Sequence, residues 1–255
     1  LFGSKVGDFL QQGTLALGTV RELIAQQFNQ LSNAQKDILT SLAISREPVS
    51  FAALRSELFT LSPAKLIELL ERLEHQSWIE RYGALFSLQP VIMEYVSDWL
   101  IAQVSQEIQA STPKLLKTHA LLRVAAKDYI RTTQSQLILQ PILNRIESDS
   151  ADLLPILWQF LSQLRHKSAS EVGYAGGNLL NLLLQIQPEL QGYDLSHLIL
   201  WQANLQTAIL QNVDFSDSDL SHSSFTDTFG IVFTVAYSPD GTILATGDAE
   251  GGLRL

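Results

Sequence analysis

The chain lacks cysteine, is short of basic residues and contains no long apolar run. Without Cys it can form no disulfide, thiolate metal site or cysteine nucleophile, which fits a reducing compartment, and we expect a cytoplasmic protein. Its 17 Lys and Arg face 26 Asp and Glu, and this excess of acid argues against a chain-wide surface for nucleic acid or anionic membranes. No segment approaches the roughly 18 apolar residues of a membrane helix, and no signal peptide is visible.

Motifs of catalytic chemistry are missing as well. No G-x-x-x-x-G-K-[ST] phosphate loop occurs, since Gly3-Ser4-Lys5 lacks the glycine spacing and the glycines of 173–178 follow no strand. Glu68, Glu71 and Glu74 recur at a spacing typical of a solvated helix face. The five histidines, at positions 75, 119, 166, 197 and 222, show no metal-ligand spacing. We therefore expect no enzyme, no metal and no cofactor within this chain.

The composition and the patterns of the sequence predict an α+β multidomain protein that is mainly helical. Of its 255 residues 46% are apolar, which is the composition of a folded chain. Residues 1–30 are predicted to be an arm helix, with Val20, Leu23, Ile24 and Phe28 on one apolar face.

From 31 to 110 the pattern predicts three helices, a hairpin and a long helix. Ser32, Ser50 and Ser62 precede the three helices as N-caps. The run 78–88 turns about Tyr82-Gly83, and a helix follows over 91–109. This order resembles a winged helix, whose candidate recognition helix, 62–75, would read DNA. However, 31–110 holds six Lys and Arg against ten Asp and Glu, which favours docking within the protein.

From 111 to 192 the pattern predicts a helical linker. Helices are expected over 115–135 and 136–146, with a split near Thr132-Thr133 and a bend at Pro141, and again over 152–167. A loop is expected over 168–177. The helix Asn178–Gln187 is apolar nearly all round, and we predict that it caps the segment that follows.

A period of five residues then runs from Tyr193 to Asp227. The unit Ala203-Asn204-Leu205-Gln206-Thr207 shows it best, and neither the helical nor the strand period fits it. The run resembles the pentapeptide-repeat family, in which four units make one turn of a right-handed quadrilateral β-helix. Seven units would make just under two turns. Each has Leu or Phe at its centre, namely Leu195, Leu200, Leu205, Leu210, Phe215, Leu220 and Phe225.

The repeats carry acids and no base. One interpretation is an acidic inhibitor that mimics duplex DNA toward a DNA enzyme, but fewer than two turns are too short for that. A solvated face on a spacer is favoured. The acids are Asp194, Asp214, Asp217, Asp219 and Asp227.

The tail, 228–255, resembles a truncated first WD repeat, with Pro239-Asp240-Gly241 as its hairpin turn. Half a blade has unpaired edges, so we expect a partial blade that is poorly ordered or a lone hairpin on the end of the coil.

Together these segments resemble the C-terminal half of a bacterial, cyanobacterial-type signalling NTPase of the STAND class with an NB-ARC-like motor. In that family a winged-helix His contacts nucleotide phosphate, and the matching position here is Gln89, which can donate a hydrogen bond but cannot become cationic. The resemblance implies ATP or ADP only in a motor outside this chain. It also implies intramolecular partners, the motor and a WD-repeat propeller, and other proteins bound through the propeller.

We therefore expect a non-catalytic regulatory scaffold that couples a nucleotide switch to a WD-repeat sensor, with the repeats as a rigid connector. The alternatives are a winged-helix DNA-binding regulator and an acidic pentapeptide-repeat inhibitor of a DNA enzyme. Neither nucleic acid nor a membrane is expected as a partner.

Overall fold

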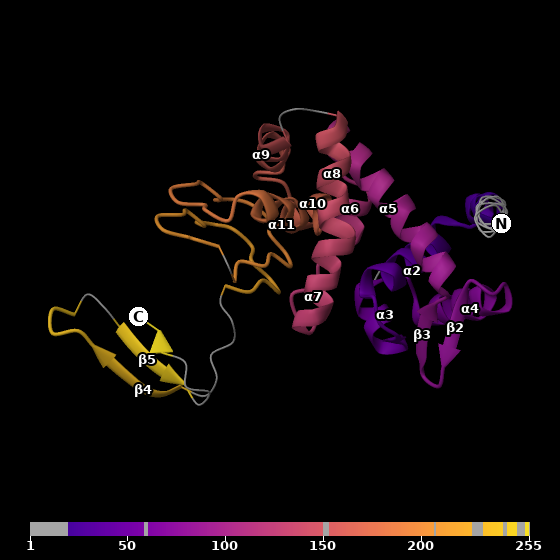
Figure 1. The fold of residues 1–255 in the computed structure, drawn as a ribbon, viewed down its shortest axis with the longest axis horizontal. Coiled ribbons are helices and arrows are strands. Elements are labelled where there is room, and N and C mark those ends of the chain that lie inside the picture. The colour runs from indigo at the N-terminus through magenta and orange to yellow at the C-terminus, as the bar shows by residue number, and fades with distance from the viewer. Residues whose placement is uncertain are drawn as a thin grey trace, which may run out of the picture.

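The computed structural model describes residues 20–58, 61–149, 153–206, 208–225, 232–241, 244–248 and 253–254. It is an α+β structure, mostly helical with two small sheets. Figure 1 shows an N-terminal unit, a central group of helices, an irregular coil and a small sheet near the C-terminus, in chain order. None of the described helices is long and apolar enough to cross a membrane.

The N-terminal unit contains α2 (Asn33–Ser45), α3 (Phe51–Glu57) and α4 (Pro63–His75). Each begins after a serine whose hydroxyl accepts from a backbone N–H, and Ser32 completes a capping box with Gln35. The unit also holds a three-stranded antiparallel sheet in the order β1-β3-β2. Its strands are β1 (Val49–Ser50), β2 (Ile79–Tyr82) and β3 (Leu85–Leu88).

Two details of this unit differ from the sequence prediction. The helix that reaches Gln30 is described from Val20, and it buries Phe28 while Val20 and Leu23 are 44% and 53% exposed. The predicted apolar face was therefore too wide, because Phe28 and Ile24 meet the core whereas Val20 and Leu23 are exposed. The hairpin of β2 and β3 gains a third strand, β1, which is two residues long and too short to show a period.

The long helix α5 (Pro90–Ala110) belongs to two hydrophobic cores. Ile92 and Val96 enter the core of the N-terminal unit, whereas Leu100 and Val104 enter the core of the central helices. Accordingly α5 packs on both α2 and α8. A helix of 21 residues is a strut of about 30 Å, so the two cores share one stiff element.

The predicted helix over 115–135 is wrong over its middle part, 119–127. Only α6 (Leu115–Thr118) and α7 (Asp128–Gln134) form, with an irregular connection over 119–127. Side chains of other elements accept hydrogen bonds from the backbone N–H groups of this connection, at Leu121, Arg123 and Val124. A helix would have satisfied the same groups locally, so tertiary contacts replace it here.

The split expected near Thr132-Thr133 does not occur. Both threonine hydroxyls donate to carbonyls four residues earlier, and the helix continues through a π-helical turn, η1 (Ser135–Leu139), into α8 (Gln140–Asp149). The π turn directly precedes Pro141, which has no N–H to donate and whose ring crowds the preceding turn. Pro141 therefore disturbs the helix by widening the turn before it, which is the π-helical turn η1.

The helices α9 (Leu153–Gln163), α10 (Ala169–Val172) and α11 (Ala175–Ile186) complete the central group. The loop predicted over 168–177 is wrong, because a capping box between Ser168 and Glu171 starts α10 and the glycines at 176 and 177 lie inside α11. Those glycines admit a close approach of another backbone, described below.

The coil after α11 repeats every twenty residues. Four parallel bridges join residues whose numbers differ by 20: Glu189 to Ile209, Asp194 to Asp214, Ile199 to Asp219, and Asn204 to Ser224. Left-handed φ values recur every five residues at His197, Gln202, Asn212, Asp217 and His222, where each unit turns its corner. The coil begins one unit earlier than predicted, since Leu190 already donates to Ile209.

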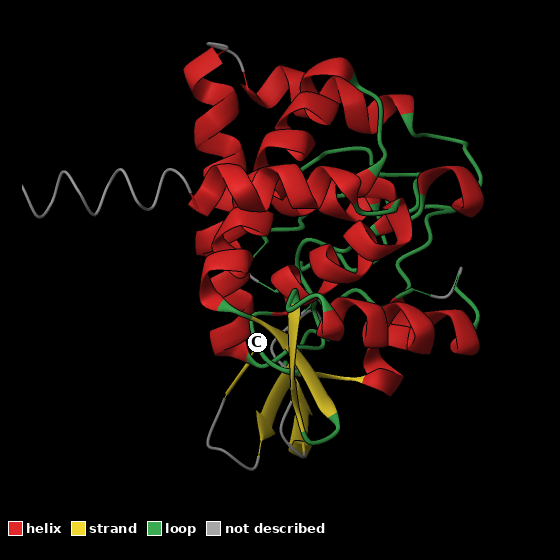
Figure 2. Cartoon of the chain, turned by 90° about the vertical axis from the view of Figure 1, so that its right-hand side faces the viewer, coloured by secondary structure: helices red, strands yellow, loops and turns green. Residues whose placement is uncertain are grey.

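The tail forms three antiparallel strands in the order β4-β5-β6, where a poorly ordered tail or a lone hairpin was predicted. They are β4 (Val232–Tyr237), β5 (Leu244–Asp248) and β6 (Leu253–Arg254), and the chain reverses a second time before the last. The turn at Pro239-Asp240 agrees with the sequence, and Gly241 adopts φ of 70° there. Val235 and Tyr237 are 57% and 72% exposed. In Figure 2 the strands of both sheets, drawn in yellow, overlap in the lower part of the view.

Candidate functional site at the junction of three units

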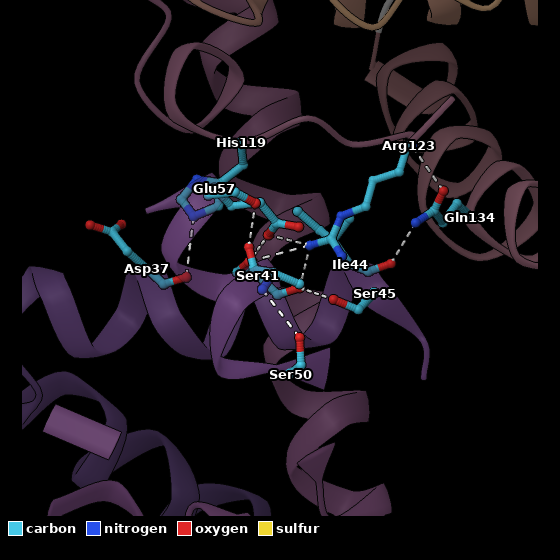
Figure 3. A network of polar contacts seen from close by, with 11 residues as sticks. Asp37, Ser41, Ile44, Ser45, Ser50, Glu57, His119, Arg123 and Gln134 are labelled. Carbon is cyan, nitrogen blue, oxygen red and sulfur yellow. Dashed lines mark hydrogen bonds and ion pairs between the residues drawn. The ribbon is translucent and has the colours of Figure 1, made fainter. Parts of the chain in front are cut away.

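A cleft of about 420 Å³, with polar and apolar walls, lies where the N-terminal unit, the connection 119–127 and the coil meet. Ser41 and Glu57 line it from α2 and α3, Arg123 from the connection, Tyr174 from the start of α11, and Gln202 from a corner of the coil. These side chains come from distant parts of the chain. Figure 3 shows the hydrogen-bond network on the α2–α3 side of this region.

Arg123 ties the connection to the N-terminal unit. Its Nη2 donates to Glu57 Oε2 at 2.5 Å and to the carbonyl of Ser41 at 3.0 Å, and the Ser41 hydroxyl also donates to Glu57. Burial raises the pKa of Glu57, and the Arg123 charge opposes that rise. Removing one partner of such a pair would leave an unpaired charge in a partly buried site, so the pair holds the two units together.

His119 forms a second tie beside the first. Its Nε2 lies 3.2 Å from the carbonyl of Asp37, and its Nδ1 lies 2.8 Å from the Thr118 hydroxyl. Burial lowers the pKa of His119 to about 4, so the ring is neutral at pH 7. A neutral imidazole has one donor and one acceptor nitrogen, and here the carbonyl requires Nε2 to be the donor.

Two amide side chains hold the irregular connection in place. Asn178 of α11 accepts from Leu121 N and donates to the carbonyls of Leu116 and His119, all within 2.7–2.9 Å. Gln134 of α7 accepts from Arg123 N at 3.0 Å and donates to the carbonyl of Ile44 at 2.9 Å. The second contact reaches α2, so the connection is bonded to both neighbours.

The first turn of the coil is closed by α11. Asn181 donates to the carbonyl of Gln202 at 2.9 Å and accepts from Asn204 N at 2.7 Å. A Cβ at Gly176 or Gly177 would lie 2.1 Å from Ile199 O or 1.8 Å from the carbonyl of Trp201, so only glycine allows this approach. These contacts place α11 against the first turn of the coil.

A further contact joins α9 to the coil. Arg165 Nη1 donates to Asp194 and to the carbonyl of Ser196, at 3.0 and 2.7 Å. Hydrogen bonds from Ser196 and Arg165 hold the pKa of Asp194 well below its usual range. Trp158 stacks on Tyr193 with ring centroids 4.4 Å apart.

The residues singled out from the sequence do not gather in one place. Gln89 is the N-cap of α5, its side chain makes no capping bond, and it does not line the cleft. The rings of His166 and His197 lie in contact with centroids 4.5 Å apart and are tilted by 36°, while His222 lines the cleft. Among the described residues no group of three or more His, Asp or Glu could hold a metal ion.

The remaining candidates occupy ordinary positions. Glu68 and Glu71 are exposed on α4, and Lys65 pairs with Glu68 at 2.9 Å. The segment 173–178, which was not expected to be a phosphate loop, is helical from Ala175 onward. Of the acids in the repeats, Asp214 and Asp219 each accept from the N–H two residues later, and Asp227 lies outside the described residues.

Sequence reasoning missed the residues that build the junction, above all Arg123, Gln134 and Asn178. Each is a polar residue inside an apolar helical pattern, and this was the available signal. A single polar residue in such a pattern does not reveal its partner, because Asn178 and Leu121 are 57 positions apart.

Comparisons with known proteins agree with the repeat. A family profile described as pentapeptide repeats matches residues 189–227 in eight copies, one more than the seven predicted. A WD repeat-containing protein of Nostoc sp. (strain PCC 7120) is 40% identical over 295 aligned residues, which cover 100% of this chain and 23% of the relative. A second one from the same organism is 39% identical over 99 residues, covering 38% of this chain and 6% of the relative.

The chain thus spans about a quarter of the first relative's length and less of the second's. It carries pentapeptide repeats and is homologous to cyanobacterial WD repeat-containing proteins, which indicates a repeat-based scaffold for protein–protein interaction.

Proposed function

We propose that the chain is a non-catalytic regulatory segment that couples a nucleotide-driven switch to a WD-repeat sensor. In this proposal 31–110 is the winged helix of a STAND-type, NB-ARC-like NTPase. The coil is a right-handed quadrilateral β-helix that seats a propeller and holds it rigidly. ATP or ADP binds only in the motor, and the propeller supplies the contacts to other proteins in the cytoplasm. A ligand on the propeller would then bias two packings of the switch.

The observation that carries this proposal is the shared junction. Contacts from α2 and α3, from the connection and from the coil converge on one cleft, and α5 enters two cores. A displacement of the coil therefore acts on the backbone at Val124, next to Arg123, and through the Arg123 side chain on Ser41 and Glu57. Packed interfaces of this kind favour discrete arrangements over gradual deformation.

The test uses the full-length protein that contains this segment. Gln134→Ala removes the bonds to Ile44 and to the connection without touching nucleotide. We expect release of a fluorescent ADP analogue to change severalfold while the fold, followed by circular dichroism, is retained. Lys65→Ala, on the exposed face of α4, is the matched control. Unchanged ADP release in Gln134→Ala, or ATP hydrolysis by the 255-residue chain alone, would contradict the proposal.

A further inference from the structure

The junction cleft has the features of a small-molecule site. Its volume of about 420 Å³ is within the range of ligand pockets, and such pockets are common where structural units meet. Its polar walls come from five segments, with Glu47, Glu57, Arg123, Tyr174 and Gln202 among them.

Several hydrogen-bond donors in this cleft have no partner among the residues that the structure describes. Arg123 has five N–H groups, and within the described part of the chain only those of Nη2 are bonded, which leaves Nε and Nη1. The Arg123 side chain is only 19% exposed and lines the cleft. The Tyr174 hydroxyl and Gln202 Nε2 likewise donate to no described residue, since Gln202 uses only its Oε1, toward Val124.

The same cleft also offers free acceptors. Glu57 accepts through Oε2 from Ser41 and Arg123, and Glu47 accepts through Oε2 from Tyr129 at 3.3 Å. Neither Oε1 atom accepts from a described residue. The cleft thus holds one permanent cation and two carboxylates, with His222 at its edge.

This charge pattern decides the class of ligand. A simple oxyanion would pair with Arg123 but would also face two carboxylates, and a simple amine would leave the Arg123 donors unpaired. A molecule with both groups satisfies both sets. We propose that the cleft binds a free amino acid or an equally small zwitterion, whose carboxylate accepts from Arg123 and Tyr174 and whose ammonium donates to Glu47 and Glu57.

The bound molecule would touch the N-terminal unit, the connection and the start of α11 at once, and so would favour the closed junction seen here. The inference goes beyond the coupling role proposed above. Binding is measurable in this chain whether or not the junction transmits a signal, so failure of one proposal leaves the other standing.

The test is calorimetric titration of the 255-residue chain with glycine, alanine and glutamate. Acetate, ethylamine and inorganic phosphate serve as probes that carry one kind of charge only. We expect saturable binding of at least one amino acid, about tenfold tighter than acetate or ethylamine, because both charge-assisted contacts are needed.

Two conservative variants locate the site. Tyr174→Phe removes one donor and Glu47→Gln one charge, and each is expected to weaken amino-acid binding about threefold to tenfold. Glu71→Gln, on the exposed face of α4, should leave binding unchanged, and circular dichroism should confirm that all three variants fold. The proposal is overturned if no amino acid binds up to about 10 mM, a weak limit for any specific site. It is equally overturned if acetate or phosphate binds as tightly, or if folded Tyr174→Phe and Glu47→Gln bind like the parent chain.

Discussion

His119 shows how one buried residue makes this protein sensitive to acid. Burial holds its pKa at about 4, against an ordinary value of 6.5. Between these two pH values the unfolded imidazole binds a proton that the folded one does not. Stability therefore falls as pH is lowered from 6.5 toward 4, and it is fully retained above 6.5.

We predict that His119→Gln flattens this acid dependence. The substitution removes a decrease in the free energy of unfolding that amounts to at most about 3 kcal/mol between pH 6.5 and 4. Each pKa unit of the shift corresponds to roughly 1.4 kcal/mol. Urea unfolding at several pH values measures it, with His75→Gln at the exposed end of α4 as the control. Equal pH slopes for His119→Gln and the parent chain would show that another group governs acid unfolding.

Gly177 shows how one missing side chain permits a close packing. Replacing Gly by Ala within a helix normally stabilises a protein by about 0.5–1 kcal/mol. At Gly177 the new Cβ would lie 1.8 Å from the carbonyl of Trp201, so α11 or the coil must shift. We predict that Gly177→Ala destabilises by about 1–3 kcal/mol, as overpacked cores do. A midpoint of denaturant unfolding that rises instead would contradict the close approach.

At the scale of elements, the decisive contact is between α11 and the coil. Repeat arrays need a cover over their terminal units, and here α11 supplies both apolar side chains and the bonds of Asn181. The central Leu and Phe residues of the repeat units are buried most where α11 covers the coil. Leu195, Leu200 and Leu205 are fully buried near α11, whereas Phe225 at the other end is 42% exposed.

We predict that Leu183→Asp melts the coil. Leu183 is fully buried in α11, and an unpaired carboxylate there costs more than about 3 kcal/mol. Leu184→Asp should cost less, because Leu184 is only half-buried. Amide exchange at Leu195 and Leu200, which donate to the second turn, reports the coil directly. Unchanged protection and unchanged β circular dichroism in Leu183→Asp would rule out the capping role.

At the scale of the whole molecule, charge distinguishes the proposed function from its main alternative, a winged-helix DNA-binding regulator. A net charge of −9 and an α4 whose Lys65 is already paired with Glu68 oppose a phosphate-binding face. We predict no retardation of duplex DNA by this chain in an electrophoretic titration at low salt. Binding whose affinity falls steeply with salt would support a DNA-binding regulator instead.

Local sequence signals were sufficient for much of the architecture. The serine caps, the Pro at position 63 and the stripe of Leu66, Leu69, Leu70 and Leu73 place α4 as predicted. The five-residue period locates the coil, apart from one unit at Leu190. In both cases the residues that define the element are neighbours along the chain, so their pattern is visible without a partner.

The junction could not be predicted in this way. The connection 119–127 has a helical pattern, yet it is irregular because Asn178, Gln134 and Gln202 bind its backbone from other elements. Likewise no pattern pairs Arg123 with Glu57, which is 66 positions away. The sequence by itself determined the serine-capped helices of the N-terminal unit, the five-residue period of the repeats and the turn at Pro239-Asp240. Only the tertiary structure decided which backbone groups were satisfied at a distance, because a hydrogen bond depends on proximity in space and not on order along the chain.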